Sequence, residues 1–506
     1  MTRALPTAPR PARAGAFPAT LLAAALAAGC SAAPPKTPPS PSKTSPPACE
    51  TGTLGLEAGT LSRQARERRG LPPETRGAVV TEVLPGGAAE RAGLLRGDVL
   101  LAVGGKELAN DCDLVLSAWG LPCRPVGVVL LRAGARREVE LVPGDEGELL
   151  GRLCEEGNAT ACFRRAWLAA GRAADAGERD RALADLEAAC RIGSAEACSY
   201  AGHILLSSRE RSAEAIPTLT RSCDLGSGAG CAHLAYLHAT GTLVPRDDAR
   251  ATRLYDRSCD LGDAKGCYNV GLMAEKGRGT RLDLARAAAA YEQACEGGSA
   301  SGCTNLGFLV ERGQGAAKDP ARAADLYRLG CEGSACQGTN LVGCVNFGRA
   351  LRDGNGVAKD PSRAASVFRA ACEAEPGADD VDGAAQERWR ACSLLGALHL
   401  SGTGVPKDEA AGRELSERGC EGGDAFGCFN AAVVWANGAG GPADPALAVS
   451  FYEAACTAGD GEGCHEAGRA YEKGSGVPKD GKRAAELFRK ACAAGFEKSC
   501  GKKPRR

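Results

Sequence analysis

The chain has few aromatic residues and no excess of charge of either sign. Phe, Trp and Tyr make up 4% of its 506 residues, so each unit of the fold has only a thin apolar core. The 62 basic residues balance the 62 acidic ones, which excludes a strong overall field that would select nucleic acid or an anionic membrane. We therefore predict no nucleic-acid partner.

The usual signatures of enzymes and metal sites are also missing. Cys-x-x-Cys pairs, which typify zinc sites, do not occur, and neither Gly-x-Ser-x-Gly nor Gly-Asn-Ser-Gly-Gly is present. Ser40 to Lys43 matches Ser-x-x-Lys, but it lies in a proline-rich segment and lacks the partner motifs Ser-Asp-Asn and Lys-Thr-Gly. The sequence thus predicts no catalytic residue, no metal and no small-molecule cofactor.

Cysteine, by contrast, is abundant, with 25 residues in a regular pattern. Pairs of cysteines eight residues apart recur toward the C-terminus, and the first members of neighbouring pairs are usually 36 residues apart. A fixed period in this range is typical of a stacked repeat array, and paired cysteines indicate disulfides formed in an oxidising compartment. The regular pairs are Cys154 with Cys162, Cys190 with Cys198, Cys223 with Cys231, Cys259 with Cys267, Cys295 with Cys303, Cys420 with Cys428, Cys456 with Cys464, and Cys492 with Cys500.

Two insertions interrupt this spacing and lengthen two of the predicted disulfide loops. Relative to the regular spacing, five residues are added between Cys331 and its partner Cys344, and twelve are added between Cys372 and Cys392. The odd Cys336 competes with Cys331, because pairing it with Cys344 restores the eight-residue separation. Three further cysteines have no predicted partner and their pairing stays open: Cys49, Cys112 and Cys123.

Each 36-residue unit is predicted to form two short helices, because apolar positions at helical spacing stop at Gly-x-Gly and again at the glycine inside each cysteine pair. Helix B should begin at an aspartate twelve residues before the first cysteine, where a carboxylate caps the helix. Helix A of the next unit begins near the second cysteine. Its motif Asn-x-Gly supplies a small residue that lets two helices approach closely. The capping aspartates are Asp247, Asp283, Asp319, Asp360, Asp408, Asp444 and Asp480.

Residues 1–29 have the layout of a signal peptide, because arginines precede an apolar run, Leu21 to Ala28, that is too short to span a bilayer. The run ends in Leu26-Ala-Ala-Gly-Cys30, which resembles a bacterial lipoprotein box with its Leu one position early. The resemblance implies lipidation of Cys30 and, since Ser31 follows, a lipoprotein anchored in the outer membrane. Ordinary secretion into the periplasm is the alternative. Residues 30–50 are rich in proline and read as a tether.

Between residues 51 and 145 the period changes from helical to alternating, which predicts a small β-rich domain. Gly93 and the pair Gly104-Gly105 supply a helix end and a hairpin turn. Strands are predicted over 77–83, 98–103, 126–131 and 137–142, and short helices over 88–92 and 113–119.

This region resembles a PDZ domain of the bacterial periplasmic-protease type. The resemblance rests on the motifs Leu54-Gly-Leu56, Arg69-Gly-Leu-Pro72, Val83 to Leu94 and Arg96 to Leu100. It implies that an extended peptide C-terminus adds as a strand to the edge of the sheet. It also implies a carboxylate held by N–H groups around Leu54, Gly55 and Leu56, and a groove closed by a helix carrying Leu114 and Ala118. A PDZ fold retained only as a spacer is the alternative.

The array over residues 147–506 is similar to Sel1-like repeats. The similarity rests on Asn-Leu-Gly, then Gly-x-Gly-Val-Pro-Lys-Asp, then Arg-Ala-Ala-x-Leu-Phe-x-x-Ala-Cys. With its paired cysteines, the array looks most like the Helicobacter cysteine-rich protein family. The resemblance implies a Sel1/TPR-like α/α solenoid, a right-handed superhelix of disulfide-stapled helix pairs. Some members are described as β-lactam-binding or β-lactamase proteins.

An asparagine follows the second cysteine of several units by two residues. Stacked repeats would place these side chains in a row suited to an extended peptide backbone. Alternatively, each asparagine bonds its own helix end or the neighbouring loop. The residues are Asn269, Asn305, Asn346 and Asn430.

Together these features predict a multidomain cell-envelope lipoprotein that acts as an adaptor. The PDZ groove would bind peptide C-termini, the solenoid would bind a second envelope protein, and a lipid anchor would hold the chain at the membrane. A hydrolase acting on β-lactams is the alternative from a different class, and a purely structural envelope protein is a third.

Overall fold

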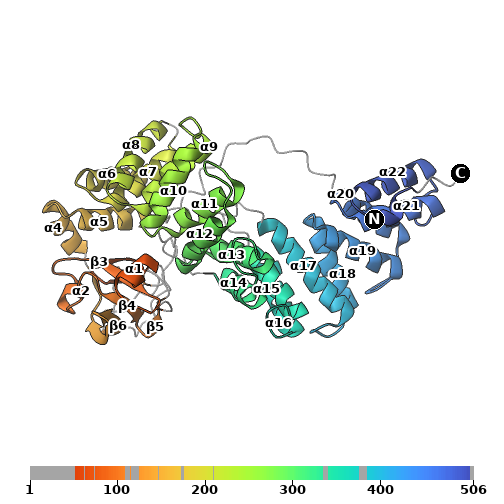
Figure 1. The fold of residues 1–506 in the computed structure, drawn as a ribbon, viewed down its shortest axis with the longest axis horizontal. Helices are drawn as coiled ribbons and strands as arrows, with labels where there is room; N and C mark the ends of the chain where they lie inside the picture. Colours follow the sequence, from red (N-terminus) through yellow and green to blue (C-terminus); the bar gives the residue numbers. More distant parts are fainter. Residues whose placement is uncertain are drawn as a thin grey trace.

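The computed structural model describes residues 52–61, 63–72, 75–108, 114, 125–145, 147–172, 176–208, 210–333, 340–374 and 384–501. It confirms the predicted fold class, because a small antiparallel sheet precedes a long curved array of paired helices (Figure 1). The predicted signal peptide, Cys30, the tether, Ala118 and the cysteines Cys49, Cys112, Cys123 and Cys336 lie outside the described residues.

The sheet of the N-terminal region is antiparallel and follows the strand order β2-β3-β4-β6-β7, with β5 paired to β4. A separate short ladder joins β1 to β8. The strands alternate apolar residues toward a core that includes Ala78, Val80, Leu100 and Leu130. The elements are β1 Gly52–Thr53, β2 Leu56–Thr60, α1 Arg63–Arg68, β3 Ala78–Val83, α2 Ala88–Arg91, β4 Val99–Val103, β5 Lys106–Glu107, β6 Val126–Arg132, β7 Ala135–Leu141 and β8 Gly144–Asp145.

The helical array alternates helices A and helices B. Helices A of neighbouring repeats pack side by side, for example α7 with α9 and α13 with α15. Helices A are α5 Ala159–Arg172, α7 Ala195–Ser207, α9 Gly228–Thr240, α11 Ala264–Lys276, α13 Ala300–Arg312, α15 Leu341–Asp353, α17 Ala384–Ser401, α19 Ala425–Asn437 and α21 Gly461–Lys473. Helices B are α4 Gly147–Glu155, α6 Ala176–Arg191, α8 Ala215–Asp224, α10 Asp248–Asp260, α12 Leu284–Glu296, α14 Pro320–Glu332, α16 Pro361–Glu373, α18 Glu409–Glu421, α20 Pro445–Thr457 and α22 Gly481–Ala493. The short 3₁₀ turns are η2 Ser212–Glu214 and η3 Glu497–Ser499.

The predicted helix starts are confirmed. Each of the seven aspartates is the N-cap of its helix B, and its carboxylate accepts a backbone N–H of the first turn. From α9 onward, helices A end instead at a glycine in the left-handed region, such as Gly277 at φ 63° or Gly354 at φ 78°. These two kinds of cap set the length of most helices at 13 residues.

Most disulfides join the end of a helix B to the first turn of the helix A that follows. Two of them differ. Cys392 lies in the middle of α17, and the last disulfide joins α22 to the residue directly after η3. Each sequence-predicted partner therefore lies within bonding distance of its cysteine. The ten disulfides of the described chain are Cys154 with Cys162, Cys190 with Cys198, Cys223 with Cys231, Cys259 with Cys267, Cys295 with Cys303, Cys331 with Cys344, Cys372 with Cys392, Cys420 with Cys428, Cys456 with Cys464, and Cys492 with Cys500.

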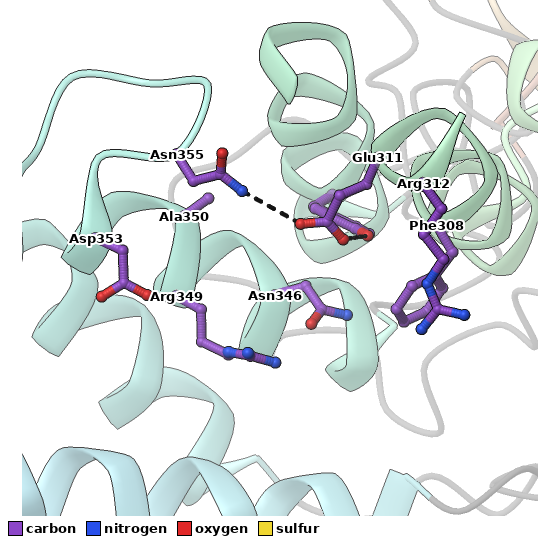
Figure 2. Close-up of a pocket in the computed structure, with 9 residues that line it drawn as sticks. Phe308, Glu311, Arg312, Asn346, Arg349, Ala350, Asp353 and Asn355 are labelled. Carbon is purple, nitrogen blue, oxygen red and sulfur yellow. Dashed lines mark hydrogen bonds between the residues drawn. The ribbon is translucent and has the colours of Figure 1, made fainter. Parts of the chain in front are cut away.

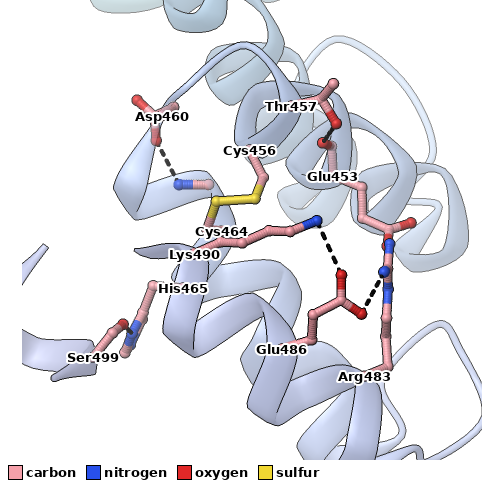
Figure 3. Close-up of a disulfide and its surroundings, with 11 residues drawn as sticks. Glu453, Cys456, Thr457, Asp460, Cys464, His465, Arg483, Glu486, Lys490 and Ser499 are labelled. Carbon is pink, nitrogen blue, oxygen red and sulfur yellow. Dashed lines mark hydrogen bonds and ion pairs between the residues drawn. A yellow bond between two sulfur atoms is a disulfide. The ribbon is translucent and has the colours of Figure 1, made fainter. Parts of the chain in front are cut away.

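Each disulfide closes a short loop that contains the start of the next helix. Figure 3 shows the example of Cys456 and Cys464, with Asp460 in the turn capping the second helix. In the chain-entropy model, a loop of this length contributes about 2 to 3 kcal/mol. The disulfides thus compensate for a core with few large side chains.

The small residue of Asn-x-Gly explains how the two helices of a repeat pack. A Cβ at Gly271 would lie 2.4 Å from the Tyr291 ring, and a Cβ at Gly348 would lie 2.4 Å from the Phe368 ring. The aromatic side chain of helix B therefore occupies the space that the glycine of helix A leaves open. Tyr291 and Phe368 are completely buried in consequence.

The N-terminal region packs directly against the N-terminal half of the solenoid, from α4 to α12. Leu84, at the end of β3, lies in an apolar cluster with Leu150 and Leu153 of α4. The guanidinium of Arg66 in α1 contacts Glu296, at the end of α12, at 2.6 Å, and its side chain is only 4% exposed. The sheet and the solenoid therefore share an interface that is both apolar and ionic.

Candidate peptide-binding sites

Strand β2 is the first site, because it forms an edge of the sheet. It pairs with β3 on one side, in register from Leu56 opposite Val83 to Thr60 opposite Ala78. Among the described strands none pairs with its other side. An edge of this kind presents unpaired N–H and C=O groups that an extended peptide can bond.

The turn before β2 has the geometry that the sequence motif requires. Leu54 and Leu56 are each 3% exposed and point into the core, while Gly55 between them has φ 66°. The carbonyl of Gly55 accepts the N–H of Leu84 at 2.9 Å, which ties the turn to the end of β3. Leu114 is also buried in this core. The start of the edge strand is therefore held in a single conformation.

Carboxylates gather where β2 and β3 face the solenoid. Glu57 of β2 stands opposite Glu82 of β3, and Glu82 accepts a hydrogen bond from Thr160 of α5 at 2.5 Å. Burial, together with the nearby charges of Glu196 and Glu82, raises the pKa of Glu57 to about 7, although the Arg164 guanidinium acts in the opposite direction. Burial also raises the pKa of Glu196 at the start of α7. This interface is therefore sensitive to ionisation.

The four asparagines of the predicted row have different surroundings. The Asn269 amide donates to the carbonyl of Lys265 on its own helix at 2.9 Å, which matches the alternative of a local bond. The Asn305 side chain lies near the Tyr291 hydroxyl, where it acts to lower the pKa of that group against the larger effect of burial, which raises it. Within the described chain, the buried Nδ2 of Asn430 finds no hydrogen-bond partner. Asn346 lines a cavity, which is the second site.

This cavity lies between helices α13 and α15 and has a volume of about 200 Å³. Figure 2 shows its side chains reaching in from both helices and from the loop after α15. The Tyr327 hydroxyl donates to Glu311 at 2.8 Å, and the Asn355 amide donates to the other oxygen of Glu311 at 3.3 Å. The lining residues are Phe308, Glu311, Arg312, Tyr327, Asn346, Arg349, Ala350, Asp353 and Asn355.

The sequence analysis missed the two arginines of the cavity. Arg312 follows Cys303 by nine residues, whereas Arg349 follows Cys344 by five, so they do not occupy equivalent positions and no repeat pattern marks them. A partial signal did exist, because Tyr327 with Glu311 repeats the earlier pair of Tyr291 with Glu275, again 16 residues apart.

Comparisons with known families match both parts of the chain. The model of the PDZ domain matches residues 79–114. The model of the Sel1 repeat matches seven segments: 228–263, 264–299, 300–334, 342–375, 389–424, 425–460 and 461–496. A search of curated proteins found no match.

One similar solved structure covers most of the array. The c5321 protective antigen of uropathogenic Escherichia coli, which has an SLR fold, is 21% identical, with a TM-score of 0.50 over 70% of this chain and 80% of that one. Two further structures match shorter stretches. Helicobacter pylori cysteine-rich protein B is 27% identical over 25% of this chain and 96% of its own, with a TM-score of 0.22. The HtrA-type protease AlgW is 34% identical over 19% of this chain and 29% of its own, with a TM-score of 0.17.

Proposed function

We propose that this chain, a Sel1-repeat protein with a PDZ domain, is an exported adaptor that binds a peptide C-terminus through its PDZ domain and a second protein through its solenoid. Both modules are interaction domains, and their combination implies protein partners. The proposal also assigns the residues of the peptide site, a lipid anchor on the chain and a location in the cell envelope.

One observation carries the peptide site: β2 is an edge strand that begins directly after the turn formed by Leu54, Gly55 and Leu56. A peptide that pairs with β2 gains main-chain hydrogen bonds along the strand, and its terminal carboxylate meets the backbone N–H groups of the turn. The left-handed φ of Gly55 favours glycine at this position. The second helix of the domain, with Leu114 and Ala118, would supply the opposite wall of the groove.

The disulfides support the location. Ten disulfides imply an oxidising compartment and therefore an exported protein. In the described parts of the chain, no helix is long and apolar enough to cross a bilayer. Attachment through a lipid on Cys30 fits the lipoprotein-like motif there and would leave the tether over 30–50 to extend the two modules from an outer-membrane surface.

A peptide selection tests this function. The full-length mature protein is used to select from a library of random peptides with free C-termini, and the enriched peptide is then measured by fluorescence anisotropy as the free acid and as the C-terminal amide. We expect the free acid to bind, the amide to bind more weakly, and Gly55→Arg to abolish binding. Gly134→Arg is the matched control, because Gly134 has a similar φ of 78° but lies in the turn between β6 and β7.

Two results would contradict the proposal. Equal binding by the Gly55→Arg protein and the wild type would place the peptide elsewhere, and an absence of any enriched peptide would leave the PDZ domain as a spacer. Steady-state hydrolysis of a chromogenic β-lactam, lost on a point change in the solenoid, would instead support the enzymatic alternative.

A further inference from the structure

We infer that Ile192, Leu225 and Leu261, an apolar row on three consecutive turns of the array, bind the part of the peptide ligand that lies upstream of the C-terminus held at β2. The inference rests on the proposed peptide-binding function and deepens it, because it adds a second recognised segment to the same ligand. The occupant of the row is therefore an apolar stretch of the peptide chain whose C-terminus the PDZ domain binds.

Leu225 and Leu261 are exposed residues at equivalent places in neighbouring repeats. Each directly follows the last residue of its helix B, and the two residues are 43% and 44% exposed. Both turns carry the same six residues, Arg-Ser-Cys-Asp-Leu-Gly, over 221–226 and 257–262. The disulfide that begins in each turn ties it to the helix A that follows. The two leucines therefore stand on fixed turns and form a surface rather than isolated exposed side chains.

Large apolar residues occupy this place in three consecutive repeats of the described array, and the other repeats lack them. Ile192, directly after α6, is 48% exposed and is the first of the three. The repeat before it has Glu156 at this place. Every repeat after Leu261 has a glycine or an alanine there, namely Gly297, Gly333, Ala374, Gly422, Ala458 and Ala494. The apolar row is therefore a local feature and not part of the repeat pattern.

The N-terminal region contacts the same edge of the array on both sides of this row. On one side, Glu82 of β3 accepts a hydrogen bond from Thr160 in the first turn of α5. On the other side, Arg66 of α1 pairs at 2.6 Å with Glu296, the last residue of α12. Figure 1 shows the sheet below α4 and α5, and α1 next to α12. The turns after α6, α8 and α10, which carry the apolar row, lie between these two contacts.

Strand β2 runs in the direction of the row. Glu57, near the start of β2, is close enough to Glu196 of α7 for the charge of one to act on the other. The chain that leaves β2 at Thr60 leads into α1, where Arg66 reaches α12. A peptide whose C-terminus lies at the turn before Leu56 pairs antiparallel with β2. Followed upstream from its C-terminus, this peptide therefore runs from α7 toward α12.

Such a peptide directs side chains toward the solenoid. Leu56 is buried in the core of the sheet and Glu57 faces the solenoid, and an added strand alternates between the same two faces. A strand rises about 3.3 Å per residue and packed helices lie about 10 Å apart, so one repeat corresponds to about three residues of the peptide. Leu225 and Leu261 then meet residues about three and six positions upstream of the one beside Glu57. Apolar side chains fit there, because their burial against the leucines is favourable.

The test compares two lengths of one peptide on the full-length mature protein. Random decapeptides with free C-termini are selected on the wild type, and the affinities of the enriched decapeptide and of its C-terminal tetrapeptide are measured by fluorescence anisotropy. We expect Leu, Ile, Val, Phe or Met to be enriched among the six residues upstream of the tetrapeptide. The decapeptide should bind about tenfold more tightly than the tetrapeptide, because only the decapeptide buries the apolar surface of the row.

The double variant Leu225→Ser with Leu261→Ser should remove the advantage of the decapeptide and leave the affinity for the tetrapeptide unchanged. The unchanged tetrapeptide affinity shows that the PDZ domain of the double variant is still folded. Leu282→Ser is the matched control and should keep the advantage. Leu282 is 66% exposed, but it lies in the turn between α11 and α12, where a helix A leads into a helix B on the opposite edge of the array.

Three results would overturn the inference: equal affinities of the two peptides for the wild type, an advantage of the decapeptide that survives in the double variant, or self-association of the wild type in sedimentation velocity that the double variant loses. The last result would assign the apolar row to a second copy of the chain. The proposed function fails separately. Binding of the tetrapeptide that requires its free carboxylate supports that function even where the decapeptide gains nothing, whereas a wild type that enriches no peptide contradicts both.

Discussion

Replacing Glu57 with glutamine should stabilise the protein at alkaline pH and have much less effect under acidic conditions. Glu57 lies on β2 where the sheet meets the solenoid, opposite Glu82 and near Glu196. Because its pKa rises from 4.5 to about 7 on folding, the folded protein holds a proton that the unfolded chain has already released. Glutamine occupies the same space and carries no charge at any pH.

The magnitude follows from proton linkage. Each tenfold change in acidity corresponds to about 1.4 kcal/mol, so full ionisation of Glu57 costs the folded state at most about 3 kcal/mol. The cost is absent below pH 4.5, grows as the pH rises toward about 7, and is complete above that value. Glu57→Gln should therefore raise the free energy of unfolding by about 3 kcal/mol at pH 8 and by about 1 kcal/mol at pH 5.

Urea unfolding of oxidised wild type and variant at both pH values measures this difference. Glu140→Gln is the control, because Glu140 is an exposed carboxylate on β7, a strand of the same sheet. A stabilisation by Glu57→Gln that is equal at pH 5 and pH 8, or that Glu140→Gln reproduces, would refute the reasoning. A stabilisation that is clearly larger at pH 8 than at pH 5 would show that ionisation of Glu57 opposes the packing of the sheet on the solenoid.

Two further predictions concern the interface and the core. Arg66→Ala leaves the carboxylate of Glu296 unpaired at a largely buried contact, so we expect the free energy of unfolding to fall by about 3 kcal/mol. Calorimetry should then show separate transitions for the sheet and the solenoid. A single unchanged transition would contradict this prediction. Gly348→Ala places a methyl group against the Phe368 ring and should lower the free energy of unfolding by about 1 to 3 kcal/mol. Gly151→Ala lies in a helix with open space around it and should raise the free energy of unfolding by about 0.5 to 1 kcal/mol. Thermal unfolding of both variants checks that the two changes have opposite signs.

The elements that the sequence predicts correctly depend on neighbours close along the chain. Asp283 caps the helix that begins at the next residue, and Cys295 bonds Cys303 eight residues later. The strands over β3, β4, β6 and β7 follow the same logic, because alternation is read within a few residues. Such local signals suffice for the helix ends, the disulfides and the strands.

Local sequence signals predict the candidate peptide-binding sites only in part. Periodicity places Asn269 and Asn346 at equivalent positions, yet one amide bonds its own helix and the other lines a cavity. The difference arises because the residues around each amide, such as Arg349, belong to adjacent helices that do not repeat. A repeat pattern therefore predicts where a side chain lies and not what it meets.

The amino-acid sequence by itself determined the repeat architecture, the helix caps and the disulfides, since each depends on residues within one or two repeats. Only the tertiary structure decided how the sheet docks on the solenoid and which side chains line the same cavity. Arg66 and Glu296 are 230 residues apart in the chain, and Glu57 on β2 lies close enough to Glu196 on α7 for the charge of one to raise the pKa of the other. Contacts over such separations are set by the summed rotation of many repeats, which no local pattern records.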